Sequence, residues 1–314
     1  MKKTFILTSS ALLLCLAFSQ NSKADSNIEF SRVSGKNRYE TAVAISKESF
    51  KHTDSVVLAN GEDFADALSG GQLASALDSP ILLTNKNTIS ATTLKEIDRL
   101  SPRKIYILGG DNSVSKTVEN GLSSKYSVDR LGGENRFETS KLIRNKSISL
   151  GKSRDTIIVN GRNFADALSA GSIVANTDYT MILSEKNVNP TINADNVLLV
   201  GGKGSLNYDY PHSNRIEGLT RYETSSNIAN KFFAKSENAI IVSGEDFPDA
   251  LTAVSLSKKH KAPLILSKRY GANDTSVDYI KKHTNNAIIV GGESSVSDIA
   301  VSYTHLTLPT TERV

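Results

Sequence analysis

The chain has 314 residues, a formal charge of +4 from 37 Lys and Arg against 33 Asp and Glu, and a single cysteine. One cysteine excludes an internal disulfide framework, so the fold has to be stable through its core. The near balance of charge excludes a strongly basic molecule, and any argument for an anionic partner has to rest on where individual cations lie.

The first 24 residues have the pattern of a secretory signal peptide. Lys2 and Lys3 supply the positive start, residues 5–18 are apolar, and small residues precede a cleavage position after Ala24. Removal of this segment would take Cys15 and three lysines with it, which lowers the formal charge from +4 to +1. An uncleaved anchor is the alternative reading of this segment. After the signal we predict no membrane span, because no later run is long and apolar enough.

Beyond the signal, the sequence repeats one unit three times. The stretch 61–86 returns as 161–186 and again as 244–269, each with a tight turn, a helix and a short apolar strand. Self-similarity at so long a period indicates tandem copies of one structural unit. The predicted divisions are a signal peptide 1–24, repeats 25–128, 129–213 and 214–301, and a tail 302–314 that resembles none of the repeats.

In chain order, the first repeat predicts an alternation of helices and buried strands. Continuous apolar runs such as 55–59 and 80–83 favour parallel strands that are covered on both faces. Strands that alternate with helices indicate an α/β fold, with helices on both faces of a mainly parallel sheet. We therefore predict three tandem α/β subdomains. The expected elements are helix 41–50, strand 55–59, a helix inside 61–86, strand 80–83, helix 94–100, strand 104–110 and a short helix 113–121.

The third repeat looks unfinished. Residues 291–301 follow the pattern of 109–118, but the segment after them resembles nothing in the first two copies. We therefore expect the third repeat to lack its closing helix residues and its final strand. The tail 302–314 looks foreign to the fold.

Comparison of the repeats also indicates whether every unit has catalytic residues, because such residues would recur at equivalent positions. No two histidines are equivalent, and the sequence has no Ser-His-Asp, Cys-His, HExxH or GxSxG pattern. We predict no catalytic residue, no metal site and no cofactor. The histidines are His52, His212, His260, His283 and His305.

An aspartate recurs near the start of a helix in all three copies. A carboxylate there meets unpaired helix N–H groups and the helix dipole, and it could pair with an arginine that also recurs. A catalytic carboxylate pair is the alternative, but the acidic neighbour found in two copies is Asn163 in the middle copy. We predict a structural role for Asp66, Asp166 and Asp249 and for Arg38, Arg136 and Arg221.

A hydroxyl and then a cation follow the apolar strand of every copy. Glycine pairs at 109–110, 201–202 and 291–292 end another strand at what should be the same edge of the sheet. Ligands of open parallel sheets settle beyond the carboxyl ends of the strands. Hydroxyls, backbone amides and a cation there suit a phosphate-bearing ligand, and a solvated surface cation is the alternative. The hydroxyls are Thr84, Ser184 and Ser267, and the cations are Lys86, Lys186 and Arg269.

Four motifs occur three times in register over about 32–301: R-x-x-G-x-x-R-[YF]-E-T, G-x-[DN]-F-x-D-A-L, a P-I-L-L type strand and a strand that ends in Gly-Gly. Together they resemble the clostridial cell-wall-binding repeat 2 family. The resemblance implies three Rossmann-like subdomains in a triangular, pseudo-threefold arrangement. It also implies non-covalent attachment to an anionic, teichoic-acid-like cell-wall polysaccharide, since such modules hold surface-layer and other wall proteins.

In that family the Ile-Leu-Leu strand motif is tied to polymer binding, and it falls here on 81–83. The second copy lacks the proline and the first leucine, and the third changes the order, so equal affinity of the three copies is not expected. The candidates that the resemblance adds to the hydroxyls and cations are Ile81, Leu82, Leu83, Ile182, Leu183, Ile265 and Leu266.

The sequence thus predicts a secreted, non-enzymatic anchoring module at the cell wall or surface of a Gram-positive bacterium. The expected partners are an anionic cell-wall polysaccharide and surface-layer proteins, and no nucleic acid. A cell-wall hydrolase of the amidase type, or a surface adhesin, with its effector domain outside this chain is the alternative.

Overall fold

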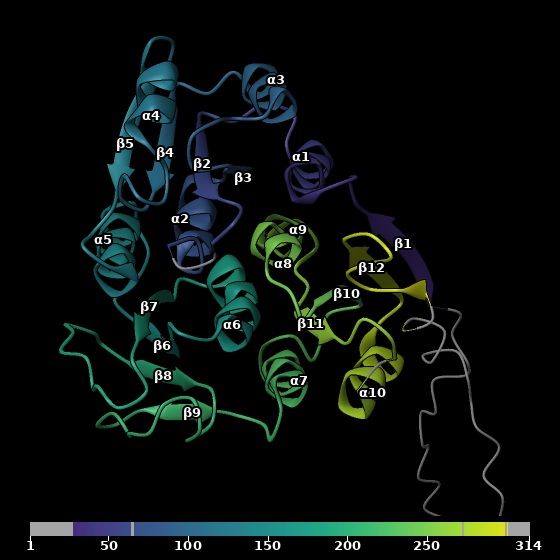
Figure 1. The fold of residues 1–314 in the computed structure, drawn as a ribbon. Helices are drawn as coiled ribbons and strands as arrows, with labels where there is room; N and C mark the ends of the chain where they lie inside the picture. Colours follow the sequence, from purple (N-terminus) through teal and green to yellow (C-terminus); the bar gives the residue numbers. More distant parts are fainter. Residues whose placement is uncertain (1–27, 64–65, 272, 299, 301–314) are drawn as a thin grey trace, which may run out of the picture.

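The computed structural model describes residues 28–63, 66–271, 273–298 and 300, so the predicted signal peptide and tail lie outside the described residues. Within these ranges the strands form three parallel sheets of four strands each, and helices pack on them (Figure 1). The predicted α/β class with three Rossmann-like units is therefore confirmed.

All three sheets have the same strand order. The first strand of the unit lies between the second and the third, and a fourth strand pairs with the third. The first sheet runs β3 (Ile81–Thr84), β2 (Ser55–Asn60), β4 (Lys104–Leu108) and β5 (Ser127–Leu131). The second runs β7 (Thr180–Ser184), β6 (Thr156–Asn160), β8 (Val197–Val200) and β9 (Asn214–Ile216). The third runs β11 (Leu264–Ser267), β10 (Asn238–Ser243), β12 (Asn286–Val290) and β1 (Glu29–Val33).

The helices of the three units occupy corresponding places. The first unit has α1 (Arg38–Ser49), α2 (Gly70–Leu77), α3 (Ala91–Leu100) and α4 (Lys116–Ser123). The second has α5 (Arg136–Ser149) and α6 (Phe164–Asn176). The third has α7 (Arg221–Phe232), α8 (Pro248–Thr252), α9 (Val254–His260) and α10 (Asp274–His283).

Both faces of each sheet are buried, which explains the continuous apolar runs. In β2, Val57 and Ala59 belong to a central core that all three units share, whereas Val56 and Leu58 belong to a separate outer core under α3 and α4. Alternate residues of a strand point to opposite faces. A strand with apolar neighbours on both faces therefore has no polar alternation.

The three units form a closed triangle. The helices α2, α6 and α9 meet at its centre, and Figure 1 shows them inside the three sheets. Each of them also packs against the first helix of the next unit, as α2 does with α5, α6 with α7, and α9 with α1. This cyclic contact confirms the pseudo-threefold arrangement.

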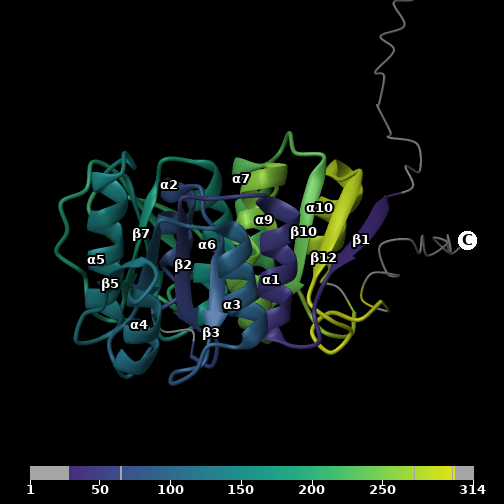
Figure 2. The same cartoon turned by 90° about the horizontal axis from the view of Figure 1, so that it is seen from above.

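The N-terminal strand closes the ring. β1 pairs in parallel with β12, from Glu29 opposite Asn286 to Val33 opposite Val290, and the two strands lie side by side in Figure 2. We expected the third repeat to lack its final strand, and in the structure β1, which lies outside that repeat, takes the place of this strand. At the other boundaries, β5 and β9 complete the sheet of the preceding unit in the same way. The strand that carries the first arginine of each R-x-x-G-x-x-R motif thus belongs to the sheet of the preceding unit.

The pseudo-threefold axis has a specific packing. The equivalent positions on α2, α6 and α9 are Gly71, Gly171 and Val254. A Cβ atom on either glycine would lie 3.2 Å from a methyl carbon of Val254. One valine thus fills the space that two glycines leave.

Candidate functional site

The apolar strand residues predicted at the site lie in the core. Each of them is at most 2% exposed, because β3, β7 and β11 are covered on both faces. A polymer cannot touch these side chains while the units stay folded. Any contribution of theirs to binding is therefore indirect, through the loop that each strand carries. The residues are Ile81, Leu82, Leu83, Ile182, Leu183, Ile265 and Leu266.

The three predicted hydroxyls are also buried. Thr84, Ser184 and Ser267 are 0%, 3% and 4% exposed, and each hydroxyl donates to a carbonyl of the loop that follows. For example, Ser184 Oγ lies 2.7 Å from the carbonyl oxygen of Val188. We correct the expectation that these hydroxyls face a ligand, since they shape the turn that carries the cation instead.

The predicted cations keep an equivalent place in all three units. In each unit, the backbone carbonyl of the cationic residue accepts a hydrogen bond from an N–H group in the segment that follows the glycine pair. This bond ties the loop to the carboxyl edge of the sheet. The side chain of Lys86 is partly exposed, and those of Lys186 and Arg269 are exposed. Over the described ranges no ion pair engages these three side chains. The bonds are Ser115 N to Lys86 O (2.8 Å), Asn207 N to Lys186 O (2.7 Å) and Ser297 N to Arg269 O (3.0 Å).

The recurring aspartates pack against the glycine that ends the neighbouring strand. Asp166 and Asp249 are held there by serine hydroxyls, each 2.9 Å from the carboxylate. A Cβ atom on the facing glycine would lie 2.4 Å from the aspartate Oδ2 in every unit, and the glycine φ is positive. Only glycine fits this position. The glycine φ angles are +93° at Gly109, +111° at Gly201 and +101° at Gly291.

The recurring arginines lie at the boundaries between units. The guanidinium carbon of Arg221 lies 5.4 Å from the ring centre of Phe164 in the preceding unit. The guanidinium carbon of Arg38 lies 5.8 Å from the ring centre of Phe247. Burial raises the pKa of Asp166, and its bond from a serine and the charge of Arg221 in the next unit oppose that rise. The structure thus brings predicted Asp and Arg residues of neighbouring units into one place. Each arginine also donates to a glycine carbonyl of its own unit, from Arg38 to Gly61, Arg136 to Gly161 (2.9 Å) and Arg221 to Gly244 (2.6 Å).

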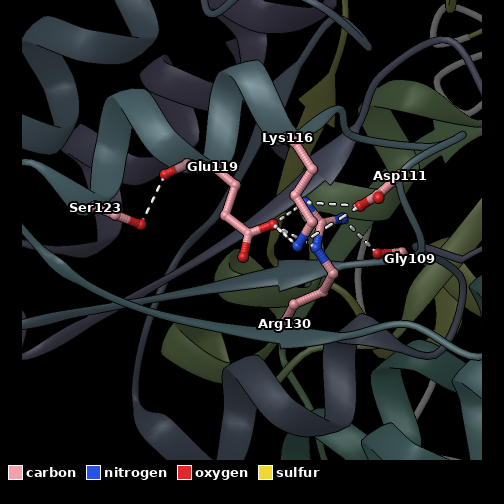
Figure 3. Close-up of polar contacts among 6 residues, drawn as sticks. All are labelled: Gly109, Asp111, Lys116, Glu119, Ser123 and Arg130. Atoms are coloured by element: carbon pink, nitrogen blue, oxygen red, sulfur yellow. Dashed lines mark hydrogen bonds and ion pairs between the residues drawn. The ribbon is translucent and has the colours of Figure 1, made fainter.

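The sequence reasoning did not assign the arginine that opens the first motif. Figure 3 shows Arg130 between the carbonyl of Gly109 and the carboxylate of Glu119. Its Nη1 donates to Gly109 O (2.8 Å), and its Nη2 lies 2.6 Å from Glu119 Oε2. Lys116 and Arg130 together lower the pKa of Glu119. The recurrence of this arginine was the available signal, since Arg32 and Arg215 bind Gly291 O (2.7 Å) and Gly201 O (2.6 Å) alike.

The rest of the first motif caps a helix. Asn37 accepts two backbone N–H groups at the start of α1, and Thr41 Oγ1 accepts the N–H of Gly35 (3.1 Å). Glu40 accepts the N–H of Lys36 (3.1 Å). The bonds to Asn37 satisfy donors that the helix itself leaves unpaired, and the bonds from Gly35 and Lys36 fix the segment just before the helix, so this part of the motif stabilises the fold.

At the opposite, amino edge, a cavity of about 1120 Å³ opens where α2, α6 and α9 end. Lys152 of the second unit reaches into it and donates to two carbonyls of its own unit, Val174 O (2.8 Å) and Thr177 O (2.5 Å). It also donates to Ser75 Oγ of the first unit (3.2 Å). Lys258 of the third unit donates to Ser75 O (2.9 Å). Lysines at helix C-termini satisfy free carbonyls and oppose the helix dipole. These two lysines therefore join the units at this edge.

Lys152 gives a testable pH dependence. Burial lowers the pKa of its amine to about 8 from the usual 10.5. Between these values the unfolded chain binds more protons than the folded one, so the free energy of unfolding is expected to rise with pH. Solvent screening of this partly exposed group weakens the effect. Denaturant unfolding from pH 8 to 10 measures the rise, and K152M should abolish it. An equal rise in K152M would contradict the assignment.

Two other kinds of feature are absent from the described ranges. No helix there has the length and apolar character that crossing a membrane requires. The same ranges hold no group of three or more His, Cys, Asp or Glu placed to bind a metal ion.

Comparison with known proteins agrees with this architecture. The family model of cell wall binding domain 2 matches residues 32–119, 130–210 and 215–301. The chain is 32% identical over 275 residues to the amidase enhancer of Bacillus subtilis (strain 168), covering 85% of this chain and 39% of that protein. It is 30% identical over 306 residues to the N-acetylmuramoyl-L-alanine amidase LytC of the same organism, covering 93% of this chain and 60% of that one.

Among solved structures, Cwp6 from Clostridium difficile is 27% identical with a TM-score of 0.83, covering 92% of this chain and 50% of that one. Cwp8 from Clostridium difficile is 27% identical with a TM-score of 0.78, covering 88% of this chain and 51% of that one. The chain thus spans from about two fifths to three fifths of the length of these four proteins. Since the family model matches all three units, the chain belongs to the cell wall binding domain 2 (CWB2) family.

Proposed function

We propose that this chain anchors an exported protein to the cell wall by binding an anionic, teichoic-acid-like polysaccharide without a covalent bond. Family membership supports wall binding. The single observation that supports an anionic ligand is the set of three cations at equivalent carboxyl edges, Lys86, Lys186 and Arg269, whose side chains take part in no ion pair of the described residues. A polymer with repeating charges can engage three modest sites together, which raises the overall affinity.

We also propose that the chain has no reaction centre of its own. The residues that would suit a carboxylate mechanism are Asp166, which is buried, and Asp249, which is partly buried, and both are bonded to serines. The likeness to LytC keeps one alternative, in which the chain is the anchoring part of a wall hydrolase of the amidase type. A zymogram of the purified chain against peptidoglycan tests for activity in this part, and a clear zone would overturn the proposal. In the proposed setting the chain is secreted and works at the wall of a Gram-positive bacterium, with surface-layer proteins as neighbours.

The cation set is tested by sedimentation of the purified chain with Gram-positive cell walls that carry a phosphodiester-linked anionic polymer. The same walls stripped of polymer with hydrofluoric acid should bind poorly. In the triple variant K86Q/K186Q/R269Q, binding is expected to weaken about tenfold, at about 0.5 kcal/mol for each exposed contact. The salt dependence of binding should also fall.

The matched control removes three exposed cations from helices of the same units. Lys95, Lys141 and Lys231 are exposed on α3, α5 and α7, and K95Q/K141Q/K231Q changes the net charge by the same amount. If both triple variants lose binding equally, net charge decides and the edge cations have no special role. If stripped and intact walls bind the native chain alike, the polymer proposal fails.

A further inference from the structure

The three carboxyl-edge loops differ in charge and in aromatic content. The first repeat has Asn85, Lys86 and Asn87 after the strand hydroxyl, and the second has Glu185, Lys186 and Asn187. The third has Lys268, Arg269 and Tyr270 at the same places. The formal charges of the three loops are therefore +1, 0 and +2, and only the third has an aromatic side chain.

In each of the first two loops, the side chain just before the cation is already engaged. The hydroxyl of Tyr39 donates to Asn85 in the first repeat. In the second, Arg162 Nη2 lies 2.5 Å from Glu185 Oε1, so the carboxylate neutralises a nearby cation. Lys86 and Lys186 each remain the one basic side chain of their loop.

The third loop presents its groups to solvent on a fixed backbone. The carbonyl of Arg269 accepts both the N–H and the hydroxyl of Ser297, at 3.0 Å and 2.8 Å. The N–H of Arg269 donates to Glu245 Oε2 (3.2 Å). Tyr270 is nevertheless 61% exposed, and the Arg269 guanidinium carbon lies 4.8 Å from its ring centre. The backbone is therefore held while the guanidinium and the ring stay accessible together.

These groups match the two parts of a charged sugar. A guanidinium binds phosphate or carboxylate through paired hydrogen bonds, and a neighbouring ammonium adds charge. Lys268, the preceding residue, adds a second positive charge to the loop, and its Nζ lies 5.8 Å from the ring centre of Tyr222. An exposed tyrosine offers a flat apolar face and a polar tip, and the C–H face of a pyranose ring packs on such a surface. One loop thus combines a contact for the anionic group with a contact for the ring that bears it.

We infer that residues 268–270 of the third repeat form the principal binding site of the chain, for a sugar ring that carries a phosphate or carboxylate group. The inference rests on the proposed function and makes the three repeats unequal. The first and second repeats then contribute only a single cation each to the same polymer.

Exchange of loop residues between repeats tests this directly. The variant K268N/R269K/Y270N gives the third repeat the residues of the first, and N85K/K86R/N87Y does the reverse. With polymer-bearing walls, the first variant is expected to bind about tenfold more weakly, since it loses one charged and one aromatic contact. K86Q alone should change binding less than about threefold. Combining both exchanges should restore part of the loss, and thermal unfolding should show that all variants are folded.

Single substitutions separate the two kinds of contact. Y270A should weaken binding about fivefold without changing its salt dependence, whereas R269Q should lower the salt dependence. Y270F should bind as the native chain does, because the ring face and not the hydroxyl is used.

The outcomes distinguish this inference from the function on which it rests. If the native chain sediments with intact but not stripped walls and K268N/R269K/Y270N binds as well as it does, the third loop is not the principal site although the proposed function stands. If the native chain shows no preference for intact walls, the proposed function and this site both fail.

Discussion

Deletion of residues 25–33 is expected to unfold the third unit before the other two. The deletion removes β1 and leaves β12 as an unpaired edge. It also removes Ile28 from the outer core of the third unit and the bonds from Arg32 to Gly291 O (2.7 Å) and Val296 O (2.9 Å). Loss of these buried contacts should cost roughly 4 kcal/mol or more. Hydrogen exchange should show early loss of protection in β10, β11 and β12, with β2 and β4 still protected.

A peptide added in trans supplies the control. A synthetic peptide of residues 25–37 is expected to restore protection to β12, because it can pair in parallel with the edge that the deletion leaves unpaired. The same peptide with Arg32 replaced by alanine should restore less. A truncated chain that unfolds in one transition, at the denaturant concentration of the full chain, would show that β1 is not needed to close the ring.

Substitution G71V is expected to be the most destabilising single change at the axis. A Cβ atom at this position already lies 3.2 Å from two methyl carbons of Val254, and the two further methyl groups of valine have no free space. Overpacking of this kind costs about 3 kcal/mol. Denaturant unfolding measures it as a lower midpoint with an unchanged slope.

The second substitution V254G tests the pairing across the axis. Alone, it should also destabilise, because it leaves a cavity and places a glycine in α9. Together, G71V/V254G moves the valine from one unit to another around the axis, so the double variant should be more stable than G71V alone. Such a gain is the sign of direct coupling. Additive losses would mean that the two positions do not share one space.

The sequence predicted the elements well where a pattern is local. The run 55–59 is apolar without alternation because Val57 and Ala59 face one core and Val56 and Leu58 face another. The partner of β1 could not be predicted in this way, since Arg32 meets Gly291 across 259 positions of the chain. Nothing in a local window marks such a pairing.

The candidate site was predicted less well, for a physical reason. The sequence showed that Thr84 lies at the end of an apolar strand. Its hydroxyl donates to Thr88 O (3.0 Å), and this bond depends on the path of the loop, which the sequence does not show. Burial of a short polar side chain depends on such local bonds. The three cations were predicted because a charge repeated at the end of a buried strand is visible in the sequence alone, and their role in binding stays a prediction.

The closure of the ring by β1 also sets an order of events during synthesis. The first strand of the module emerges long before β12, so every shorter chain leaves one sheet incomplete. Closing so large a loop is slow, because contacts distant in sequence form late. A growing chain therefore reaches its final shape only after the third unit has followed the first two.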